Sequence, residues 1–321
     1  MNGNAGSIDV SVLVLSYYHE KYIAQALESV LTQETDLTYE ILVGDDASGD
    51  RTPEIVREYA QRYPDIIKPV LRKKNTGAGY NGWDLIRRSK GTYTATLEGD
   101  DFWLDPKKMQ KQWEFLEAHK EYVGCTGKCV IVDENGTPDY QRGCHFAWNK
   151  KVFTLQDLID SWQVPGQVGA GMTRNFLRDM DPEEYSIFYT AHPNVGDKTG
   201  TLLALAHGPI YCFNEVFSCY RVVDKKGEHN WFSIHHSNPY RNYDMFMYPC
   251  KLESWARKNM DLPRNQHLGK RNAYRFARFV EECVHSPTPK RLKYLAEMVA
   301  GSHQPLKYCW YILKALIEME D

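Results

Sequence analysis

The sequence predicts an α/β fold: a mostly parallel sheet of the Rossmann-like kind, flanked by helices and followed by a C-terminal helical region. Two observations carry this prediction. Apolar runs alternate with segments of helical periodicity over the first 132 residues, and three amphipathic segments follow one another from about residue 251. Strands that alternate with helices need crossover connections, which produce a parallel sheet covered on both faces.

Five stretches in the first part of the chain have the composition of buried strands. They are residues 10–17 (VSVLVLSY), 39–46 (YEILVGDD), 66–72 (IIKPVLR), 92–97 (TYTATL) and 122–132 (YVGCTGKCVIV). A continuous apolar run is typical of a strand that is buried on both faces. Pro69 cannot donate a ladder hydrogen bond, so we expect the third strand to lie at an edge of the sheet or to end there.

Helical periodicity fills the intervals between these strands. The predicted helices cover residues 22–33, a segment from Thr52, a segment that ends near Ser89 and a segment that starts near Pro106. Apolar side chains recur three and four residues apart in them, as on the buried face of a helix. Beyond Pro138 the pattern becomes irregular. There we expect helices over 154–162 and 196–208 and extended chain over 166–174 and 210–222.

The bulk composition restricts the class of protein. The chain is 42% hydrophobic with a net charge of −3, which is typical of a globular protein and excludes a broad basic field for nucleic acid. Its eight cysteines are scattered and its first residues do not resemble a signal peptide, so we expect reduced thiols in the cytoplasm. No apolar run approaches the roughly 18–20 residues that cross a bilayer, so any work at a membrane is expected from its surface.

Carboxylates gather at two predicted strand ends, namely Asp45 with Asp46 and the stretch ATLEGDDFW at residues 95–103. In sheets of this kind, ligands bind beyond the carboxyl ends of the strands. Clustered carboxylates repel one another unless a hard cation such as Mg²⁺ or Mn²⁺ offsets their charge. The alternative is a solvated acidic turn in which Asp105 caps the following helix.

Five segments in a fixed order resemble the family 2 glycosyltransferases, whose nucleotide-sugar-binding fold is called GT-A. The segments are VSVLVLSYYHEKYIAQALESVLTQ (10–33), YEILVGDDASGDRT (39–52), NTGAGYNGWDLIRRSKGTY (75–93), ATLEGDDFW (95–103) and NVGDKTGTLLALAHGPIYCFNEVFSCYRV (194–222). The resemblance implies a catalytic domain over residues 8–222, with a nucleotide-sugar half (8–132) and an acceptor half (133–222). A loop region near the active site (223–250) and a helical region (251–321) would follow.

The resemblance also implies a donor site with a divalent metal. It places the nucleotide sugar near Ser16, Tyr17, Glu20, Asp45, Asp46, Asn81, Glu98, Gly99, Asp101, Trp103 and Arg221. Asp100 is the implied direct ligand of Mn²⁺ or Mg²⁺. Glu98 is one methylene longer than the family's aspartate, so it contacts the metal, a metal-bound water or the ribose. Asp101 contacts the sugar or caps the next helix.

Further roles follow from the same resemblance. Asp197 falls on the general base, and the alternative for it is a helix cap. Arg221 matches the arginine of a Tyr-Arg pair that contacts a phosphate of the donor or a loop that closes over it. The alternative is that Arg221 forms a buried structural ion pair. Relatives often carry a metal-binding histidine two residues later, where this chain has Val223. His229 is the candidate that would replace this histidine as a metal ligand. The alternative is that His229 is an ordinary histidine of a surface loop. The ring of Trp103 stacks on a sugar or serves as packing.

The sequence therefore predicts an inverting glycosyltransferase that moves a sugar from a UDP-sugar to a hydroxyl of a saccharide or lipid-linked acceptor, in cell-surface polysaccharide synthesis. The alternative is a non-catalytic nucleotide-sugar-binding or scaffold protein, although such a protein would need no base at Asp197. Residues 251–321 hold 13 Lys and Arg against 8 Asp and Glu, a charge of +5. We expect this region either to contact the inner face of an anionic membrane, to pack on the catalytic domain or to form a homodimer.

Overall fold

A computed structural model of the chain describes most of its residues. These are residues 7–139, 144–145, 148–183, 185–192, 194–223, 238–260, 262–263, 266–268, 272–302 and 305–317. The chain forms two compact units. Unit 1 consists of Met1–Leu155 with Gln163–His229, and unit 2 of Gln156–Trp162 with Asn230–Asp321. None of the helices in the described ranges is long and apolar enough to cross a membrane.

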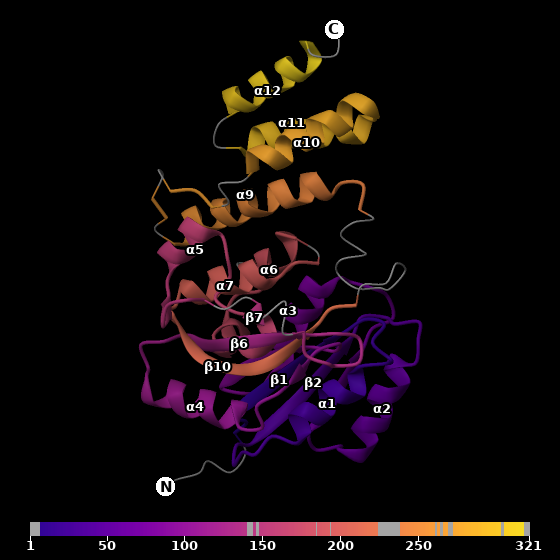
Figure 1. Cartoon of the computed structure of the whole chain (residues 1–321), viewed down its shortest axis with the longest axis vertical. Coiled ribbons are helices and arrows are strands. Elements are labelled where there is room, and N and C mark those ends of the chain that lie inside the picture. Colours follow the sequence, from indigo (N-terminus) through magenta and orange to yellow (C-terminus); the bar gives the residue numbers. More distant parts are fainter. Residues whose placement is uncertain are drawn as a thin grey trace. The chain divides into compact units, whose positions relative to one another are not determined.

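Unit 1 contains a sheet with ten strands among the described residues (Figure 1). The strands are β1 (Val10–Ser16), β2 (Tyr39–Asp45), β3 (Ile67–Leu71), β4 (Tyr93–Glu98), β5 (Phe102–Trp103), β6 (Gly124–Val132), β7 (Cys144–His145), β8 (Val152–Phe153), β9 (Met172–Arg174) and β10 (Ile210–Arg221). Their order is β3-β2-β1-β4-β9-β6-β10-β5, with β7 beside β6 and β8 beside β10. β3 lies at the edge, as Pro69 predicts.

The sheet is parallel where the sequence alternates most regularly. β1 pairs in parallel with β2 and β4, and β2 pairs in parallel with β3. β9 pairs antiparallel with both β4 and β6, and so connects this group to the parallel pair of β6 and β10. The short antiparallel strands β5, β7 and β8 were not predicted, because two residues carry no periodicity.

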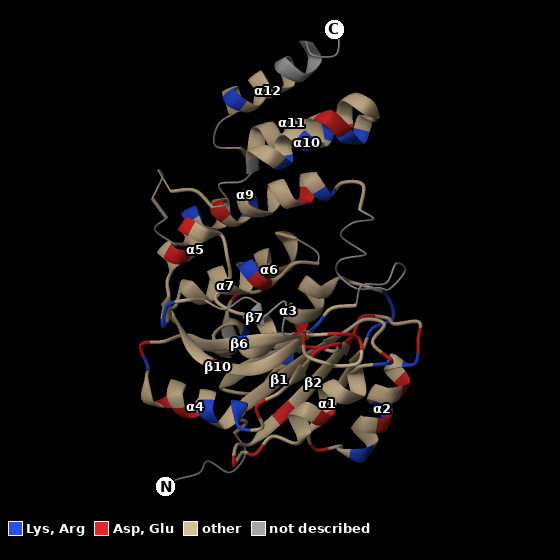
Figure 2. Cartoon of the chain, viewed as in Figure 1, with Lys and Arg blue, Asp and Glu red and all other residues tan. Residues whose placement is uncertain are grey.

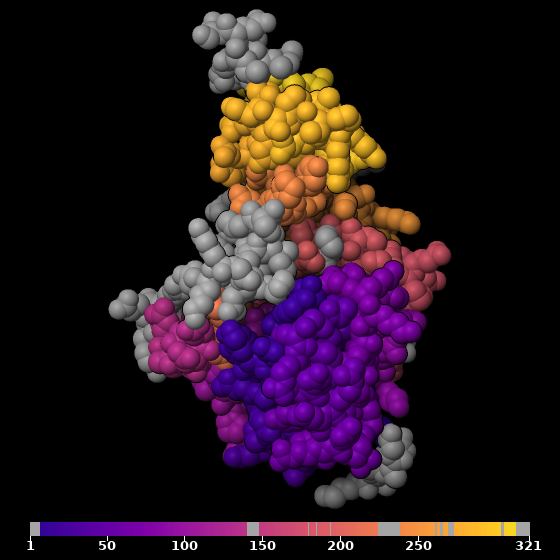
Figure 3. Space-filling view, turned by 90° about the vertical axis from the view of Figure 1, so that its right-hand side faces the viewer, coloured from indigo at the N-terminus to yellow at the C-terminus, as the bar shows by residue number. Residues whose placement is uncertain are grey.

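Hydrophobic cores lie on both faces of the parallel strands. On one face, Val12 and Val14 belong to the core that α1, α2 and α4 cover, and on the other Leu13 packs with residues of α3. The helices are α1 (Ile23–Leu31), α2 (Thr52–Arg62), α3 (Ala78–Arg88) and α4 (Lys108–Ala118). Successive side chains of a strand point to opposite faces, which explains why adjacent residues serve different cores. In Figure 3 these indigo and purple segments form one continuous face of unit 1.

The ends of three neighbouring strands determine where the candidate site lies. Ser16 at the end of β1 pairs in register with Asp45 at the end of β2, and Leu15 pairs with Glu98 at the end of β4. Figure 2 marks acidic residues in the loops beyond these strands. The carboxylates that the sequence places at two separate strand ends therefore share one edge of the sheet.

The second half of unit 1 adds short elements. These are η1 (Val168–Ala170), η2 (Leu177–Asp179), α6 (Ile187–Thr190) and α7 (Asp197–Leu205). Of these, the sequence pattern predicted only α7. One turn of helix is too short for an apolar face to repeat, so the other three leave no periodic signal.

Unit 2 is helical. Its helices are α5 (Leu155–Ser161), most of which belongs to this unit, α9 (Arg241–Asn259), α10 (Asn272–His285), α11 (Pro289–Gly301) and α12 (Pro305–Ile317). The prediction of a loop over 223–250 is wrong for its last ten residues, which begin α9. Pro249 interrupts the pattern there, and the buried face of the helix includes the polar residues Asn242 and Glu253, so no apolar stripe marks it in the sequence. The domain boundaries themselves stay a prediction.

The core of unit 2 is aromatic. Phe246 of α9 packs with Phe276 of α10 and Tyr308 of α12, and Met298 of α11 joins the same cluster. Charges of both signs occur on α9 and α11 (Figure 2). The excess of positive charge in this part of the sequence is thus interspersed with acidic residues.

Candidate functional site

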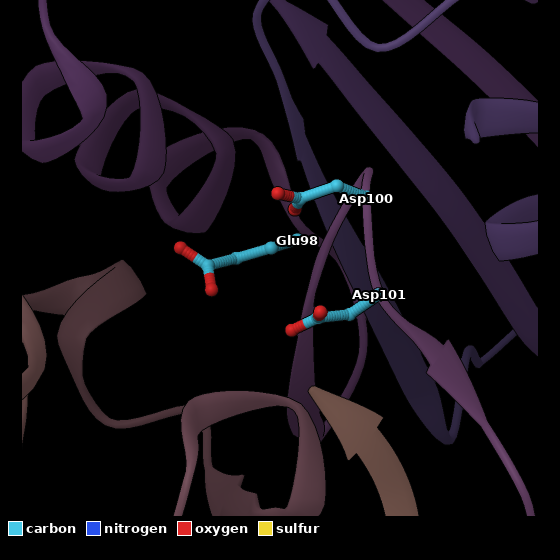
Figure 4. Close-up of side chains that lie close together, drawn as sticks. All are labelled: Glu98, Asp100 and Asp101. Atoms are coloured by element: carbon cyan, nitrogen blue, oxygen red, sulfur yellow. The ribbon is translucent and has the colours of Figure 1, made fainter. Parts of the chain in front are cut away.

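The acidic residues after β4 converge at the carboxyl edge of the sheet. Glu98 ends β4, and Asp100 and Asp101 lie in the turn that leads to β5. One carboxylate oxygen of each lies within 4.8 Å of the other two. Figure 4 shows the three side chains projecting to the same side of the turn. We call Glu98 to Asp101 the acidic turn.

Gly99 allows the acidic turn to approach the loop after β1. A methyl group on Gly99 would lie 2.7 Å from His19 Nδ1 and 3.1 Å from Ser16 Oγ. A side chain at this position would displace the imidazole, so the close approach requires glycine. The structure gives Gly99 this steric role, and a contact with the donor stays a prediction.

The electrostatics of the acidic turn favour a cation. Burial raises the pKa of Glu98 to about 8, and the carboxylates of Asp100 and Asp197 add to the rise. Burial, Asp100 and Glu98 likewise raise the pKa of Asp101. The cluster therefore resists full ionisation by itself. Its oxygen donors fit a hard divalent cation such as Mg²⁺ or Mn²⁺, which would offset their mutual repulsion.

Asp101 is bound by protein donors. The residue is 1% exposed. Its Oδ1 accepts a hydrogen bond of 2.7 Å from the backbone N–H of Arg221, and its Oδ2 accepts one of 2.7 Å from Gln167 Nε2. The expectation that Asp101 caps the next helix is wrong, because these two donors engage its oxygens. Glu98 and Asp100 are the carboxylates of the turn that accept no hydrogen bond from the described residues, so their oxygens are the more available for a cation.

Arg221 supports the acidic turn and a neighbouring turn. Its guanidinium donates to the backbone carbonyls of Asp100 (2.7 Å), Asp133 (3.1 Å) and Glu134 (2.8 Å), and to the side chain of Gln25 (2.6 Å). These bonds use four of its five N–H groups. The structure thus supports the structural alternative rather than a phosphate contact, with carbonyls in place of the expected ion pair.

Trp103 lies in the core of unit 1. Its residue surface is 4% exposed, and Lys108 Nζ lies 4.1 Å from the centroid of the ring. Its backbone N–H donates to Ser29 Oγ. The prediction that this ring stacks on a sugar is wrong, because the core and the lysine cover it.

Asp197 begins α7. The N-cap of the helix is Gly196, and no side chain makes a capping hydrogen bond, so the alternative of a helix cap at Asp197 is not observed. Asp197 keeps an exposed surface. The surrounding protein nevertheless limits its hydration and raises the pKa of the carboxyl, although the charge of Lys198 opposes this rise.

Asp197 and the acidic turn share one electrostatic environment. The Asp197 charge contributes to the raised pKa of Glu98. Burial raises the pKa of the Tyr220 phenol, and Glu98, Asp101, Asp100 and Asp197 all add to the rise. The charge of Asp197 on α7 and the charges of the turn after β4 therefore act on the same phenol, although about a hundred residues separate them in the chain.

The two aspartates after β2 hold loops. Asp45 accepts hydrogen bonds from the backbone N–H and the hydroxyl of Ser48, and burial raises the pKa of its carboxyl. Asp46 accepts from Thr76 N–H and Oγ1 and from Gly77 N–H, at 2.7–2.8 Å. Both residues are at most 3% exposed. A contact between either of them and a nucleobase stays a prediction.

The remaining predicted donor residues differ in accessibility. Ser16 is buried, and its Oγ has no hydrogen-bond partner among the described residues. Tyr17 is half-buried, whereas Glu20 is exposed and accepts a hydrogen bond from Arg51 N–H. Asn81 is 1% exposed, and both ends of its amide bond to protein groups, so it pins α3 to β2. That engagement argues against a donor contact at Asn81.

Sequence reasoning missed two residues of this site. His229 lies outside the described residues. The histidine that the structure places beside the acidic turn is His19, whose Nε2 lies 3.7 Å from Asp100 Oδ2. Gln167, which binds Asp101, also escaped notice. His19 stands two residues beyond a predicted strand end, which is a usable signal, whereas nothing in the local sequence distinguishes Gln167.

A family model described as "Glycosyl transferase family 2" matches residues 11–179. The chain belongs to this family. The match covers the acidic turn and Gln167 but ends before Asp197 and Arg221. The roles of these last two residues therefore depend on the structure and on the resemblance of residues 194–222.

Relatives of the family match part of their own length. An uncharacterised protein of Mycobacterium tuberculosis is 34% identical over 188 residues, which is 59% of this chain and 49% of that protein. The putative teichuronic acid biosynthesis glycosyltransferase TuaG of Bacillus subtilis is 33% identical over 129 residues, 40% of this chain and 50% of its own. The chain thus spans about half the length of the curated relatives it matches.

A solved structure supports the fold over most of the chain. S. aureus TarS in complex with UDP-GlcNAc superposes with a TM-score of 0.60 at 18% identity, covering 91% of this chain and 80% of that one. At this identity the likeness shows the fold alone. The predicted α/β fold of the GT-A type, with helices after the catalytic sheet, is confirmed.

Proposed function

We propose that this protein is an inverting glycosyltransferase that moves a sugar from a UDP-sugar to a hydroxyl of a saccharide or lipid-linked acceptor. The observation that carries the proposal is the acidic turn at the carboxyl edge of the sheet, where Glu98, Asp100 and Asp101 bring carboxylate oxygens within 4.8 Å of one another, and the charge of Asp197 also acts on Glu98. Carboxylates that hold a cation-bound diphosphate and a carboxylate left to act as base are the two parts that such a transfer needs. A protein that only binds the nucleotide sugar needs the first part alone.

Asp197 and the carboxylates of the acidic turn have different roles in the proposed reaction. Asp197 accepts the proton of the acceptor hydroxyl while that oxygen bonds to the anomeric carbon and the bond to the diphosphate breaks on the opposite face. Its raised pKa brings it closer to neutral pH, which favours proton transfer. Glu98 and Asp100 would hold Mg²⁺ or Mn²⁺, and a bound cation of this kind neutralises charge on the leaving diphosphate.

The comparisons support the choice of donor and pathway. TarS was solved with UDP-GlcNAc, and TuaG is named for teichuronic acid biosynthesis. The first favours a UDP-sugar as the donor of this chain, and the second favours cell-surface polysaccharide synthesis. The seven cysteines whose side chains the structure describes form no disulfide, which supports action in the cytoplasm. The mixed charges of α9 and α11 favour a homodimer contact over contact with the inner face of an anionic membrane.

A thermal-shift screen of nucleotide sugars, with and without Mn²⁺, tests the proposal. We expect a UDP-sugar to raise the unfolding temperature more when Mn²⁺ is present, and the variant Asp100→Ala to lose this extra rise. Asp65→Ala, which removes an exposed carboxylate after α2, is the matched control and should behave as wild type. An unchanged response in Asp100→Ala would contradict the metal assignment. Slow Mn²⁺-dependent hydrolysis of the same UDP-sugar is expected from a transferase and not from a binding protein.

A further inference from the structure

Gln167 makes a buried hydrogen bond to the acidic turn from a distant part of the chain. The residue is 6% exposed, and its Nε2 donates to Asp101 Oδ2 at 2.7 Å. Its Oε1 accepts from the backbone N–H of Gly169 at 2.6 Å and from Ser218 Oγ at 3.4 Å. All four groups are buried, so each bond forms away from water, where an unmade bond is costly.

These bonds determine the orientation of the amide. The N–H of Gly169 can only donate, so it requires the oxygen of the amide on its side. The nitrogen of the amide then faces Asp101, whose carboxylate accepts from it. The other oxygen of Asp101 accepts from Arg221 N–H. Within the described residues, by contrast, no hydrogen bond reaches the carboxylate of Glu98 or that of Asp100, whose one ion-pair partner is His19 at 3.7 Å.

The segment that carries Gln167 is itself fixed to α4. Gln112 Nε2 donates to the carbonyl of Ala170 at 2.8 Å, and Lys108 Nζ donates to the carbonyl of Gly171 at 3.1 Å. Lys108 Nζ also donates to Gln112 Oε1. Two long side chains of a core helix thus hold the backbone just after Gln167, and the position of its amide follows from that of the helix.

We propose that Gln167 is a positioning residue that holds Asp101 as the anchor of the acidic turn, so that Glu98 and Asp100, and not Asp101, provide the protein oxygens for the cation. This inference rests on the proposed function of the same site. The anchor fixes the backbone of the turn from both sides, through Gln167 on one oxygen and Arg221 on the other. The side chains of Glu98 and Asp100 are then held close together for the cation, and their own oxygens are not needed for hydrogen bonds that stabilise the turn.

An exchange of donor and acceptor tests the proposal. Gln167→Glu places a carboxylate against Asp101, and Asp101→Asn places one amide N–H group against another. We expect each single variant to weaken Mn²⁺ binding by about ten-fold or more, as is usual when groups that orient the metal ligands are lost. The double variant restores the pair with the roles reversed, because the amide introduced at position 101 now donates to the carboxylate introduced at position 167, and the net charge equals that of wild type. We expect it to regain Mn²⁺ affinity to within about three-fold of wild type.

Mn²⁺ affinity is measured by electron paramagnetic resonance of the free ion, with folding checked by circular dichroism. If Asp101 is a ligand, the double variant stays as weak as Asp101→Asn, and the proposal is overturned. Wild-type affinity in Gln167→Glu would overturn it too. Gln167→Leu, which adds no charge, should weaken binding even if the charged variants fold poorly. Asn175→Ala removes another buried amide of unit 1, bonded to Ser89 and Gly91, and should leave Mn²⁺ affinity unchanged. Absence of Mn²⁺ binding in wild type would instead contradict the proposed function.

Discussion

The imidazole of His19 faces the carboxylate of Asp100, with 3.7 Å between Nε2 and Oδ2. The two residues follow β1 and β4, which are neighbouring parallel strands, so their loops leave the same edge of the sheet. The distance is too long for a hydrogen bond, but it suits two groups that face a common point. The side chains are 16% and 26% exposed, and His19 Nδ1 is buried without a hydrogen-bond partner among the described residues.

This relationship predicts that His19 contributes to metal affinity. We expect His19→Ala to weaken Mn²⁺ binding by about ten-fold, because a neighbour of Asp100, the proposed metal ligand, is lost. Titration of Mn²⁺ by calorimetry measures the change. His119→Ala is the matched control, since His119 is exposed and pairs with Glu121. Equal affinities of His19→Ala and wild type would show that the histidine only fills space.

The variant Asp197→Asn tests the general base. The amide keeps the size of the side chain but cannot accept the proton, so we expect the transfer rate to fall by about 10²–10⁴-fold with donor affinity nearly unchanged. Single-turnover transfer and UDP-sugar binding are measured side by side. Glu54→Gln removes an exposed acid from the first turn of α2 and should retain full activity. Near-normal transfer by Asp197→Asn would mean that another group is the base.

The pH dependence of transfer should reflect the raised pKa of Asp197. Limited hydration by the surrounding protein shifts this pKa upward and Lys198 opposes the shift, with a net rise from the usual value of 3.8. The base acts when ionised, so activity is expected above the raised pKa and lost as the pH falls through it. Transfer rates measured at saturating UDP-sugar across the acid pH range show where this activity is lost, which is the acid limb of the pH profile. A limb at the ordinary aspartate value, or one that persists in Asp197→Asn, would assign it to a different group.

Loss of Arg221 should affect both stability and the site. Arg221→Met removes four hydrogen bonds of a buried guanidinium and leaves three carbonyls without this donor, so we expect a destabilisation of about 3 kcal/mol. Urea unfolding measures this value. Because Asp100 contributes one of these carbonyls, Mn²⁺ affinity should also fall in the folded variant. The exposed Arg57 provides the control Arg57→Met, for which a change within about 0.5 kcal/mol is expected. Unchanged Mn²⁺ affinity in Arg221→Met would separate the arginine from the site.

Glu253 should make the stability of unit 2 sensitive to acid. Burial raises its pKa, but hydrogen bonds from His267, Arg257 and the N–H of Leu268 outweigh this, and the pKa lies below its usual value of 4.5. The carboxylate therefore stabilises the folded state above about pH 4.5, and this contribution is lost as the pH falls through the lowered pKa.

The variant Glu253→Gln measures that contribution. We expect it to be less stable by about 2 kcal/mol at pH 7 and to lose less stability on acidification than wild type. Urea unfolding at several pH values provides the comparison. Glu281→Gln changes an exposed acid of α10 that pairs with Arg278, and should remain within about 0.5 kcal/mol of wild type. The same acid dependence in Glu253→Gln and wild type would rule out this carboxylate as the source.

The elements that the sequence predicted are those whose signal is local. The apolar run of β1 and the edge position indicated by Pro69 follow from side chains within a few residues of one another. The acidic turn was visible for the same reason, because its carboxylates are adjacent in the chain. α9 was missed because Pro249 interrupts its pattern and no single face of it is apolar.

By itself, the sequence determined the α/β class, the family and the position of the acidic turn at a strand end, since periodicity and adjacent charges act over short stretches of chain. Only the tertiary structure decided which oxygens of that turn are already used. Gln167 and Arg221, which lie far from Asp101 in the sequence, donate hydrogen bonds to it. His19 faces Asp100, and Trp103 is buried in the core. Burial and hydrogen-bond partners depend on groups far apart in the chain, so no local pattern records them.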